Sequence, residues 1–164
     1  MSCYPSIGLG KPRPENLQYG GRIKTANPFR SNLEFILTRA ESRKTPVILM
    51  TFATYLPRNY TRTRFQNQSL DYGAGSISLP IELWGRPEDV LRAVDQHNQV
   101  LRELANHHSN VTLIDQCEML LANGRVFSDP CHLTDQGIEQ FVSHLMPVIG
   151  RLHSSFGDRL TSGE

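Results

Sequence analysis

The sequence feature that most constrains the fold is a nearly continuous apolar run, Val47-Ile48-Leu49-Met50-Thr51-Phe52-Ala53. Such a run is typical of a strand that is buried on both faces, as in a parallel sheet, because a half-exposed strand would alternate apolar with polar residues. A second strand is predicted at Val111-Thr112-Leu113-Ile114-Asp115, beyond an amphipathic helix. A strand, a long crossover and a second strand form a parallel βαβ unit, so the predicted class is α/β.

Amphipathic helices are predicted before each of the two strands. The first covers residues 28–44, with Asn27 as its cap and Pro28 at the first helical position, where a missing N–H costs little. The second begins at Pro87, carries acidic residues in its first turn and ends near Asn106. The apolar faces of these helices consist of Phe29, Leu33, Ile36, Leu37 and Ala40, and of Val90, Val94, Leu101, Leu104 and Ala105.

Two more helices are predicted in the C-terminal part of the sequence. A short one covers residues 116–122, and a long one follows Thr134, whose hydroxyl suits a helix cap. Pro147 is expected to kink or locally unwind the long helix, because it lacks the N–H that the helical ladder needs. The apolar face of the long helix consists of Ile138, Phe141, Val142, Leu145, Ile149 and Leu152.

The chain divides into three predicted parts. Residues 1–27, rich in Pro and Gly, form an irregular N-terminal segment, residues 28–153 form the body, and residues 154–164 form a frayed tail. Within the body, residues 57–86 form a long polar stretch of the kind that is usually functional or mobile. Because a sheet of two strands is marginal by itself, either residues 1–27 supply an irregular third strand or the chain is a piece of a larger domain.

The composition excludes several classes of function. The chain has 17 Lys and Arg against 16 Asp and Glu, and this near-neutral charge gives it no field to attract nucleic acid or anionic membranes. No apolar run is long enough to span a membrane, and no secretory signal follows Met1. Three cysteines, an odd number, do not indicate a disulfide framework. We therefore expect a soluble globular domain, in a compartment that the sequence does not indicate.

The sharpest local motif lies just before the final helix, where α/β proteins present side chains to a crevice. Asp129 and His132 are three residues apart, and Pro130 stiffens the connection. In a tight turn this spacing brings the carboxylate to Nδ1 of the imidazole, which fixes the tautomer and supports the charge formed when Nε2 accepts a proton. The alternative is that Asp129 is a turn residue and His132 a partly buried histidine with satisfied hydrogen bonds.

This segment resembles the last conserved block of the SGNH (GDSL-type) hydrolases, an Asp-x-x-His-Leu-Thr stretch followed by a Gly that opens the final helix. Here it reads Asp129-Pro130-Cys131-His132-Leu133-Thr134-Asp135-Gln136-Gly137. The order of the flanking elements over residues 28–152 is similar too. The residues that carry this wider likeness are Asn32 and Leu33, the strand Val47 to Thr54, Asn98 and Leu101, and the strand end Ile114-Asp115.

The resemblance implies a flavodoxin-like, three-layer α/β/α fold and a Ser-His-Asp ester hydrolase that needs no cofactor. It makes His132 the catalytic base, Asp129 its orienting acid, and an acyl or acetyl ester of a lipid or carbohydrate the small-molecule substrate. The family's Gly-Asp-Ser nucleophile block and its Gly-x-Asn-Asp oxyanion block are both absent from this sequence, and the oxyanion role is not transferred to Asn16. The chain therefore resembles the C-terminal portion of such a domain, incomplete at its N-terminus.

Several other residues are candidates for chemistry, each with a simpler interpretation. Ser2 and Ser6 could act as nucleophiles, but neither follows a strand. Cys131 is adjacent to His132, although neighbouring residues in a turn rarely align a thiol and an imidazole for attack; it is interpreted as a small semi-buried residue or as the partner of Cys117 in a disulfide. A zinc site is conceivable from Asp129, His132 and His144, or from His107 and His108, but none of these sets has the usual ligand spacing.

A second hypothesis for the function is a binding module. Residues 55–86 interleave aromatic residues with Arg58, Arg62 and Arg64. They form either a flap that recognises a sugar or an acyl chain, or a variable surface loop with some aromatic residues folded beneath it. In the first case, the chain is a truncated or degenerate SGNH relative that binds a ligand or partner without catalysis. His97-Asn98 on the second helix either faces the crevice or forms part of a polar stripe, and the polar stripe is the preferred interpretation.

Overall fold

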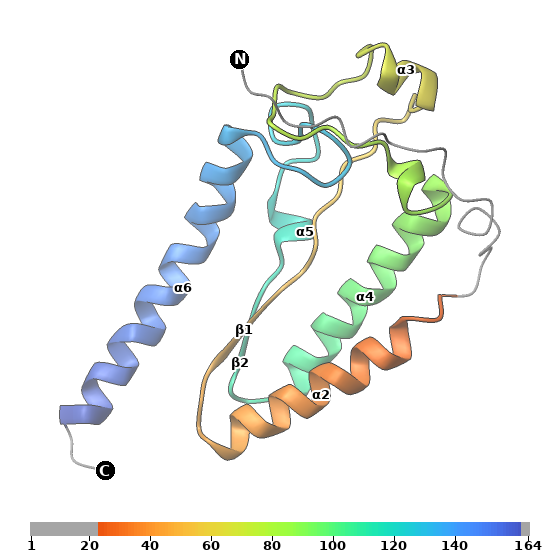
Figure 1. The fold of residues 1–164 in the computed structure, drawn as a ribbon. Coiled ribbons are helices and arrows are strands. Elements are labelled where there is room, and N and C mark those ends of the chain that lie inside the picture. The colour runs from red at the N-terminus through yellow and green to blue at the C-terminus, as the bar shows by residue number, and fades with distance from the viewer. Residues whose placement is uncertain (1–22, 162–164) are drawn as a thin grey trace.

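The computed structural model describes residues 23–161, with side chains described as far as residue 154. Figure 1 shows helices on both sides of a narrow central sheet, with α6 on one side and α2 and α4 on the other. The elements in chain order are α2 (Ala26–Ser42), β1 (Val47–Met50), α3 (Arg62–Gln66), η1 (Ile81–Leu83), α4 (Pro87–His107), β2 (Val111–Ile114), α5 (Gln116–Met119) and α6 (Asp135–Thr161).

The central sheet confirms the predicted α/β class and the parallel crossover. β1 and β2 pair in parallel, with Val47 opposite Val111 and Met50 opposite Ile114. Helix α4 connects the two strands and packs against both. No other strand pairs with this sheet in the part of the chain that the structure describes, so β1 has one edge without a strand neighbour.

The main core lies where α2 and α4 cover the sheet. Its buried residues come from both helices and from β1, and they bury apolar area that contributes roughly 25 cal/mol per Å². This core accounts for the predicted apolar faces only in part, because Ile36 is 54% exposed. The buried members of the cluster are Leu37, Leu49, Val100, Leu101 and Leu104, with Phe29, Leu33, Val47, Val111 and Leu113 packed against them.

The start of α2 differs from the prediction. The helix begins at Ala26 after Thr25, and Asn27 lies inside the first turn instead of capping it. Pro28 also lies inside that turn, where it is tolerated because the first four N–H groups of a helix have no intrahelical partner. The capping prediction for Asn27 is therefore wrong, although the helix itself is where the pattern places it.

The expectation that both strands are buried on both faces is wrong for the end of the first apolar run. Met50 is 37% exposed and Phe52 is 53% exposed. They border a groove of about 470 Å³ that is mostly apolar and that α2 and α4 also line. The sheet is only two strands wide, so no further strand or helix of the described part covers these side chains.

Asn98 corrects the interpretation of a solvent-facing polar stripe on α4. Asn98 is 1% exposed, and its side-chain amide binds both the N–H and the carbonyl of Phe52. Asn98 Oδ1 accepts from the Phe52 N–H at 2.8 Å, and Asn98 Nδ2 donates to the Phe52 carbonyl at 2.9 Å. The amide therefore ends the β1 ladder by satisfying the backbone groups that a neighbouring strand would otherwise bind.

An ion pair ties α4 to the end of β2. Arg102 donates to both carboxylate oxygens of Asp115, at 2.7 and 3.1 Å, and Thr51 donates to Asp115 Oδ1 at 2.7 Å. The Thr51 hydroxyl in turn accepts the backbone N–H of Cys117. The bonds from Arg102 hold the pKa of Asp115 below its usual range, against the opposing effect of desolvation.

Helix α6 departs from the predicted C-terminal structure in three ways. It continues through Pro147 without interruption, and it extends to Thr161 where fraying was expected from Ser154 onward. The face turned inward carries Phe141, Leu145, Val148 and Leu152, because these positions reach β2, α5 and the adjoining loops. The remaining apolar residues of this helix are exposed, namely Ile138, Val142, Met146 and Ile149.

The polar stretch at 57–86 has more regular structure than expected. It contains α3, which Thr61 caps by accepting the Arg64 N–H, and the single turn η1. The predicted helix at 116–122 is shorter, ending at Met119. Within the described residues, no helix is both long enough and apolar enough to cross a membrane.

Candidate active site

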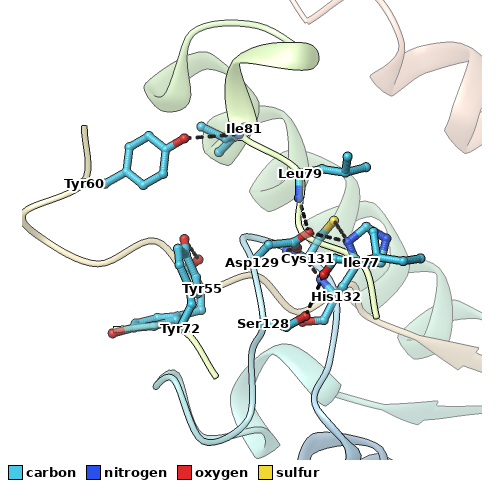
Figure 2. Close-up of polar contacts among 10 residues, drawn as sticks. All are labelled: Tyr55, Tyr60, Tyr72, Ile77, Leu79, Ile81, Ser128, Asp129, Cys131 and His132. Atoms are coloured by element: carbon cyan, nitrogen blue, oxygen red, sulfur yellow. Dashed lines mark hydrogen bonds and ion pairs between the residues drawn. The ribbon is translucent and has the colours of Figure 1, made fainter. Parts of the chain in front are cut away.

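The structure pairs Asp129 with His132 as their spacing predicts. Asp129 Oδ2 lies 2.7 Å from His132 Nδ1, and both residues belong to the loop that precedes α6 (Figure 2). The Asp129 carboxylate is fully buried, while the His132 side chain is 33% exposed. Nδ1 is bound to the carboxylate, and no described residue makes a hydrogen bond to Nε2, the other nitrogen of the ring.

The buried carboxylate is held by four donors. Its Oδ1 atom accepts the backbone N–H groups of Cys131 and His132, at 2.9 and 2.8 Å. Its Oδ2 atom accepts the backbone N–H of Leu79, at 2.7 Å, in addition to Nδ1. Hydrogen bonds to the charged form favour that form and compensate for its burial. This arrangement suits a carboxylate that orients an imidazole.

The rest of the loop is fixed by its own backbone and by the cap of α6. The Ser128 N–H donates to the His132 carbonyl at 2.9 Å, which closes the turn around Asp129. The Thr134 hydroxyl accepts the Gly137 N–H at 3.1 Å, so the predicted cap is confirmed. Gly137 also lacks room for a side chain, since a Cβ there would lie 2.2 Å from the Val126 carbonyl oxygen. These contacts explain why a Gly follows the Asp-His motif at this distance.

Cys131 lies beside the pair without the properties of a nucleophile. Its Sγ atom is 3.4 Å from His132 Nδ1, the nitrogen that already binds Asp129. Burial, and then the neighbouring Asp129 charge, raise the pKa of the thiol to about 12. A nucleophilic cysteine needs a lowered pKa, so Cys131 is a packed thiol. Cys131 and Cys117 are both free, and the disulfide alternative does not apply to this structure.

Asp129, Cys131 and His132 also form the one cluster of metal-ligand types found among the described residues, with donor atoms within 4.8 Å of one another. Both oxygens of Asp129 already accept N–H groups and His132 Nδ1 binds that carboxylate, so these donors are engaged with one another and are not arranged as an open zinc site. His144 is not part of the cluster. It bonds to Gln116 Oε1 at 2.9 Å.

The remaining sequence candidates lie elsewhere or outside the description. His107 bonds to the carbonyl of Glu103, and His108 pairs with Glu41 on α2, so both histidines are engaged at the far end of α4. Ser2, Ser6 and Asn16 lie outside the described residues. Ser128, although adjacent to Asp129, is 4% exposed, and its hydroxyl donates to backbone carbonyls instead of facing Nε2.

An aromatic cluster packs beside the loop that holds Asp129 and His132. Tyr72 packs edge-on against Tyr55 and Phe65, and its hydroxyl donates to the Tyr55 carbonyl. Burial raises the pKa of Tyr60 and of Tyr72 above the usual range of a phenol. A polar groove of about 330 Å³ lies between this cluster and Ser128. The interleaved aromatic residues of the 55–86 stretch indicated packing of this kind.

The sequence analysis missed the Leu79 contact to Asp129 and the buried role of Asn98. The Leu79 backbone N–H gives no sequence signal at all, because every residue except proline has one. The role of Asn98 could have been suspected from a lone amide on the buried stripe of α4. Comparisons of the chain with protein-family models, with curated proteins and with solved structures found no match.

Proposed function

We propose that this chain carries the acid–base half of an ester hydrolase of the SGNH type. The observation that supports the proposal is the hydrogen bond of 2.7 Å between the buried Asp129 carboxylate and Nδ1 of a histidine whose side chain is one-third exposed. His132 is then the general base and Asp129 the residue that fixes its tautomer. The sequence resemblance is the second support, since the same two residues are the ones that the family motif would assign.

The hydrogen bond from Nδ1 to Asp129 leaves Nε2 as the nitrogen that exchanges a proton with the reactants. With Nδ1–H directed to Asp129, Nε2 carries the lone pair and accepts a proton from a serine hydroxyl as the hydroxyl attacks an ester carbonyl. The resulting imidazolium is stabilised by the Asp129 charge, and Nε2 later returns the proton to the departing alcohol. The serine and the donors that stabilise the oxyanion would come from outside the described residues. We propose a small, uncharged acyl or acetyl ester of a lipid or carbohydrate as the substrate.

The proposal includes a wider, three-layer α/β/α domain. Thr51 donates its N–H to β2, so by the alternation of a strand the N–H groups of Ile48 and Met50 face the other edge of β1. Apolar side chains next to that edge are exposed, including Met50 and Phe52, which border the groove lined by α2 and α4. A further parallel strand on β1, with its own helices, would pair the edge and cover these side chains.

Hydrolysis of p-nitrophenyl acetate tests the proposal with two proteins. The chain of 164 residues should show no turnover above buffer, while the chain extended by in-frame sequence upstream of Met1 should hydrolyse the ester. In the extended protein His132→Ala should lower kcat/KM by about 1000-fold or more, whereas His107→Ala, the matched control on α4, should leave it unchanged. A fluorophosphonate should label a serine in the extended protein only.

Two outcomes would change the proposal. Turnover by the 164-residue chain that disappears in His132→Ala would place the nucleophile within this chain. An extended protein that is folded, inactive and unlabelled would exclude the hydrolase. Stop codons directly upstream of Met1 would favour the alternative of a non-catalytic binding module.

The binding module has one structural observation in its favour. Residues 55–86 are ordered around an aromatic cluster and border the polar groove at Ser78 and Ser128. A module of this kind would bind its ligand equally well after His132→Ala, and it would lose the ligand when the aromatic wall is removed by Phe65→Ala.

A further inference from the structure

A short segment crosses the site and bonds to it at three points. We call residues 73–81 the strap. The Gly73 N–H donates to the Phe127 carbonyl at 2.9 Å, Ser128 Oγ donates to the Ile77 carbonyl at 3.2 Å, and the Leu79 N–H donates to Asp129 Oδ2 at 2.7 Å. Figure 2 shows Ile77 and Leu79 next to Ser128, Asp129 and His132. The strap is therefore attached to three consecutive residues of the site loop.

The two oxygens of Asp129 are held by different parts of the chain. Oδ1 accepts only N–H groups of its own loop, those of Cys131 and His132. Oδ2, which binds His132 Nδ1, has one backbone donor among the described residues, and this donor is Leu79 on the strap, 50 residues away in sequence. The oxygen that binds the imidazole thus has its backbone donor on the strap, whereas the other oxygen has its donors in the turn that contains Asp129.

We propose that the Leu79 N–H is a positioning group for the Asp129–His132 pair. It restricts rotation of the carboxylate about the Cβ–Cγ bond of Asp129. Oδ2 then stays in line with Nδ1, and the imidazole keeps its proton on that nitrogen. Without this donor Oδ2 is held only by His132 Nδ1, and rotation of the carboxylate about the Cβ–Cγ bond moves Oδ2 away from Nδ1 against the two bonds at Oδ1. The consequence for catalysis rests on the proposed hydrolase function, whereas the effect of the Leu79 N–H on the Asp129–His132 hydrogen bond does not.

Gly75 explains how the strap comes close enough. A Cβ at this position would lie 2.3 Å from the Ser128 Cβ and 2.5 Å from its Oγ, both well inside van der Waals contact. The backbone of Gly75 is not in the left-handed region, so alanine would be accepted by the backbone and excluded only by Ser128. The substitution Gly75→Ala therefore lifts the strap without removing any hydrogen-bonding group.

Nuclear magnetic resonance of the His132 ring tests the inference on the 164-residue chain, without turnover. The ¹⁵N shifts report which ring nitrogen carries the proton, and the exchange rate of the Nδ1 proton with water reports how firmly it is held. Leu79→Pro removes the N–H at a position that already precedes Pro80 and is therefore extended. Leu79→Ala is the matched control, because it changes the side chain and keeps the N–H.

We expect the Nδ1–H tautomer in the unmodified chain and in Leu79→Ala. In Leu79→Pro and in Gly75→Ala the Nδ1 proton should exchange at least about 10-fold faster and the ¹⁵N shifts should move toward a mixture of tautomers. Ser76→Ala, an exposed position between the contacts, should change neither. A folded Leu79→Pro or Gly75→Ala chain with the exchange rate and shifts of the unmodified chain would overturn the inference.

One measurement needs no variant. In the unmodified chain the Leu79 amide should exchange with deuterium as slowly as the amides of Cys131 and His132, which bind the same carboxylate. Rapid exchange of Leu79 alone would overturn the inference even if both variants failed to fold. Failure of the hydrolase proposal would leave all these readouts unaffected, since none depends on an ester, so the two failures can be told apart.

Discussion

The site loop at residues 127–134 and the open edge of β1 lie on the same small sheet domain but are completed to different degrees. In the loop, the buried Asp129 carboxylate has four N–H donors and Thr134 caps the following helix. At the edge, Met50 and Phe52 are largely exposed, and β1 has no strand neighbour on that side in the described residues.

The difference shows which structures a chain assembles locally. The loop is built by contacts between residues two to nine apart, together with the strap, which folds back over it, and the Tyr55 N–H, which donates to the Pro130 carbonyl. The width of a sheet depends instead on strands contributed by other segments, because each strand satisfies the backbone groups of its neighbour. A hydrogen-bonded Asp–His pair can therefore be formed next to a sheet that has an unpaired edge in the described residues.

The largest expected effect is in the site loop. Asp129→Ala should lower the free energy of unfolding by about 3–5 kcal/mol, because it leaves several buried N–H groups without an acceptor. Urea unfolding measures the loss, and Asp95→Ala, an exposed carboxylate on α4, is the control. A loss below about 1 kcal/mol would mean that the loop is less tightly satisfied than its hydrogen bonds indicate, and the contrast with the edge would disappear.

Adjacent residues of β1 test the contrast within one strand. Leu49 is 7% exposed and Met50 is 37% exposed. Leu49→Ala should cost about 2–4 kcal/mol of unfolding free energy, since it opens a cavity in the main core. Met50→Ala should cost less than about 1 kcal/mol, since little buried area is lost. Equal losses for the two variants would indicate that the edge is covered in solution, for example by a second copy of the chain.

A substitution of Asn98 tests a position where the backbone at the edge of β1 already has a hydrogen-bond partner. Asn98→Ala should cost about 2–3 kcal/mol, because the N–H and carbonyl of Phe52 both lose their partner. Gln96→Ala on the exposed face of the same helix controls for helix propensity. If Asn98→Ala cost no more than its control, water would be satisfying Phe52, and the edge would be open over its whole length.

The smallest effect is the pH dependence of the Arg102–Asp115 pair. The pKa of Asp115 is lowered in the folded chain, chiefly by the bonds from Arg102. The pair therefore stabilises the fold above the ordinary Asp pKa of about 4 and loses this contribution as the pH falls through the lowered value. We expect about 1 kcal/mol or less, because both side chains are partly solvated. Arg102→Met should remove this part of the acid dependence; an unchanged acid dependence in that variant would contradict the assignment.

The sequence predicted the elements whose signal is local. The parallel crossover, the limits of α4 and the Asp129–His132 contact follow from periodicity, a Pro start and a three-residue spacing. Burial at β1 and on α6 could not be predicted, because Met50 and Val142 have the residue types of a core but lack the partners that would cover them. The strap contact to Asp129 was equally invisible, since a backbone N–H leaves no mark in the residue types.

Asn98 also limits where a further strand could pair with β1. Its amide occupies the place that a neighbouring strand would take beside Phe52. A strand that joins β1 must consequently turn away after the level of Met50, and its following residues are directed to the end of the sheet where Asp129 and His132 lie. The Asn98 side chain thus limits how far along β1 an added strand could pair.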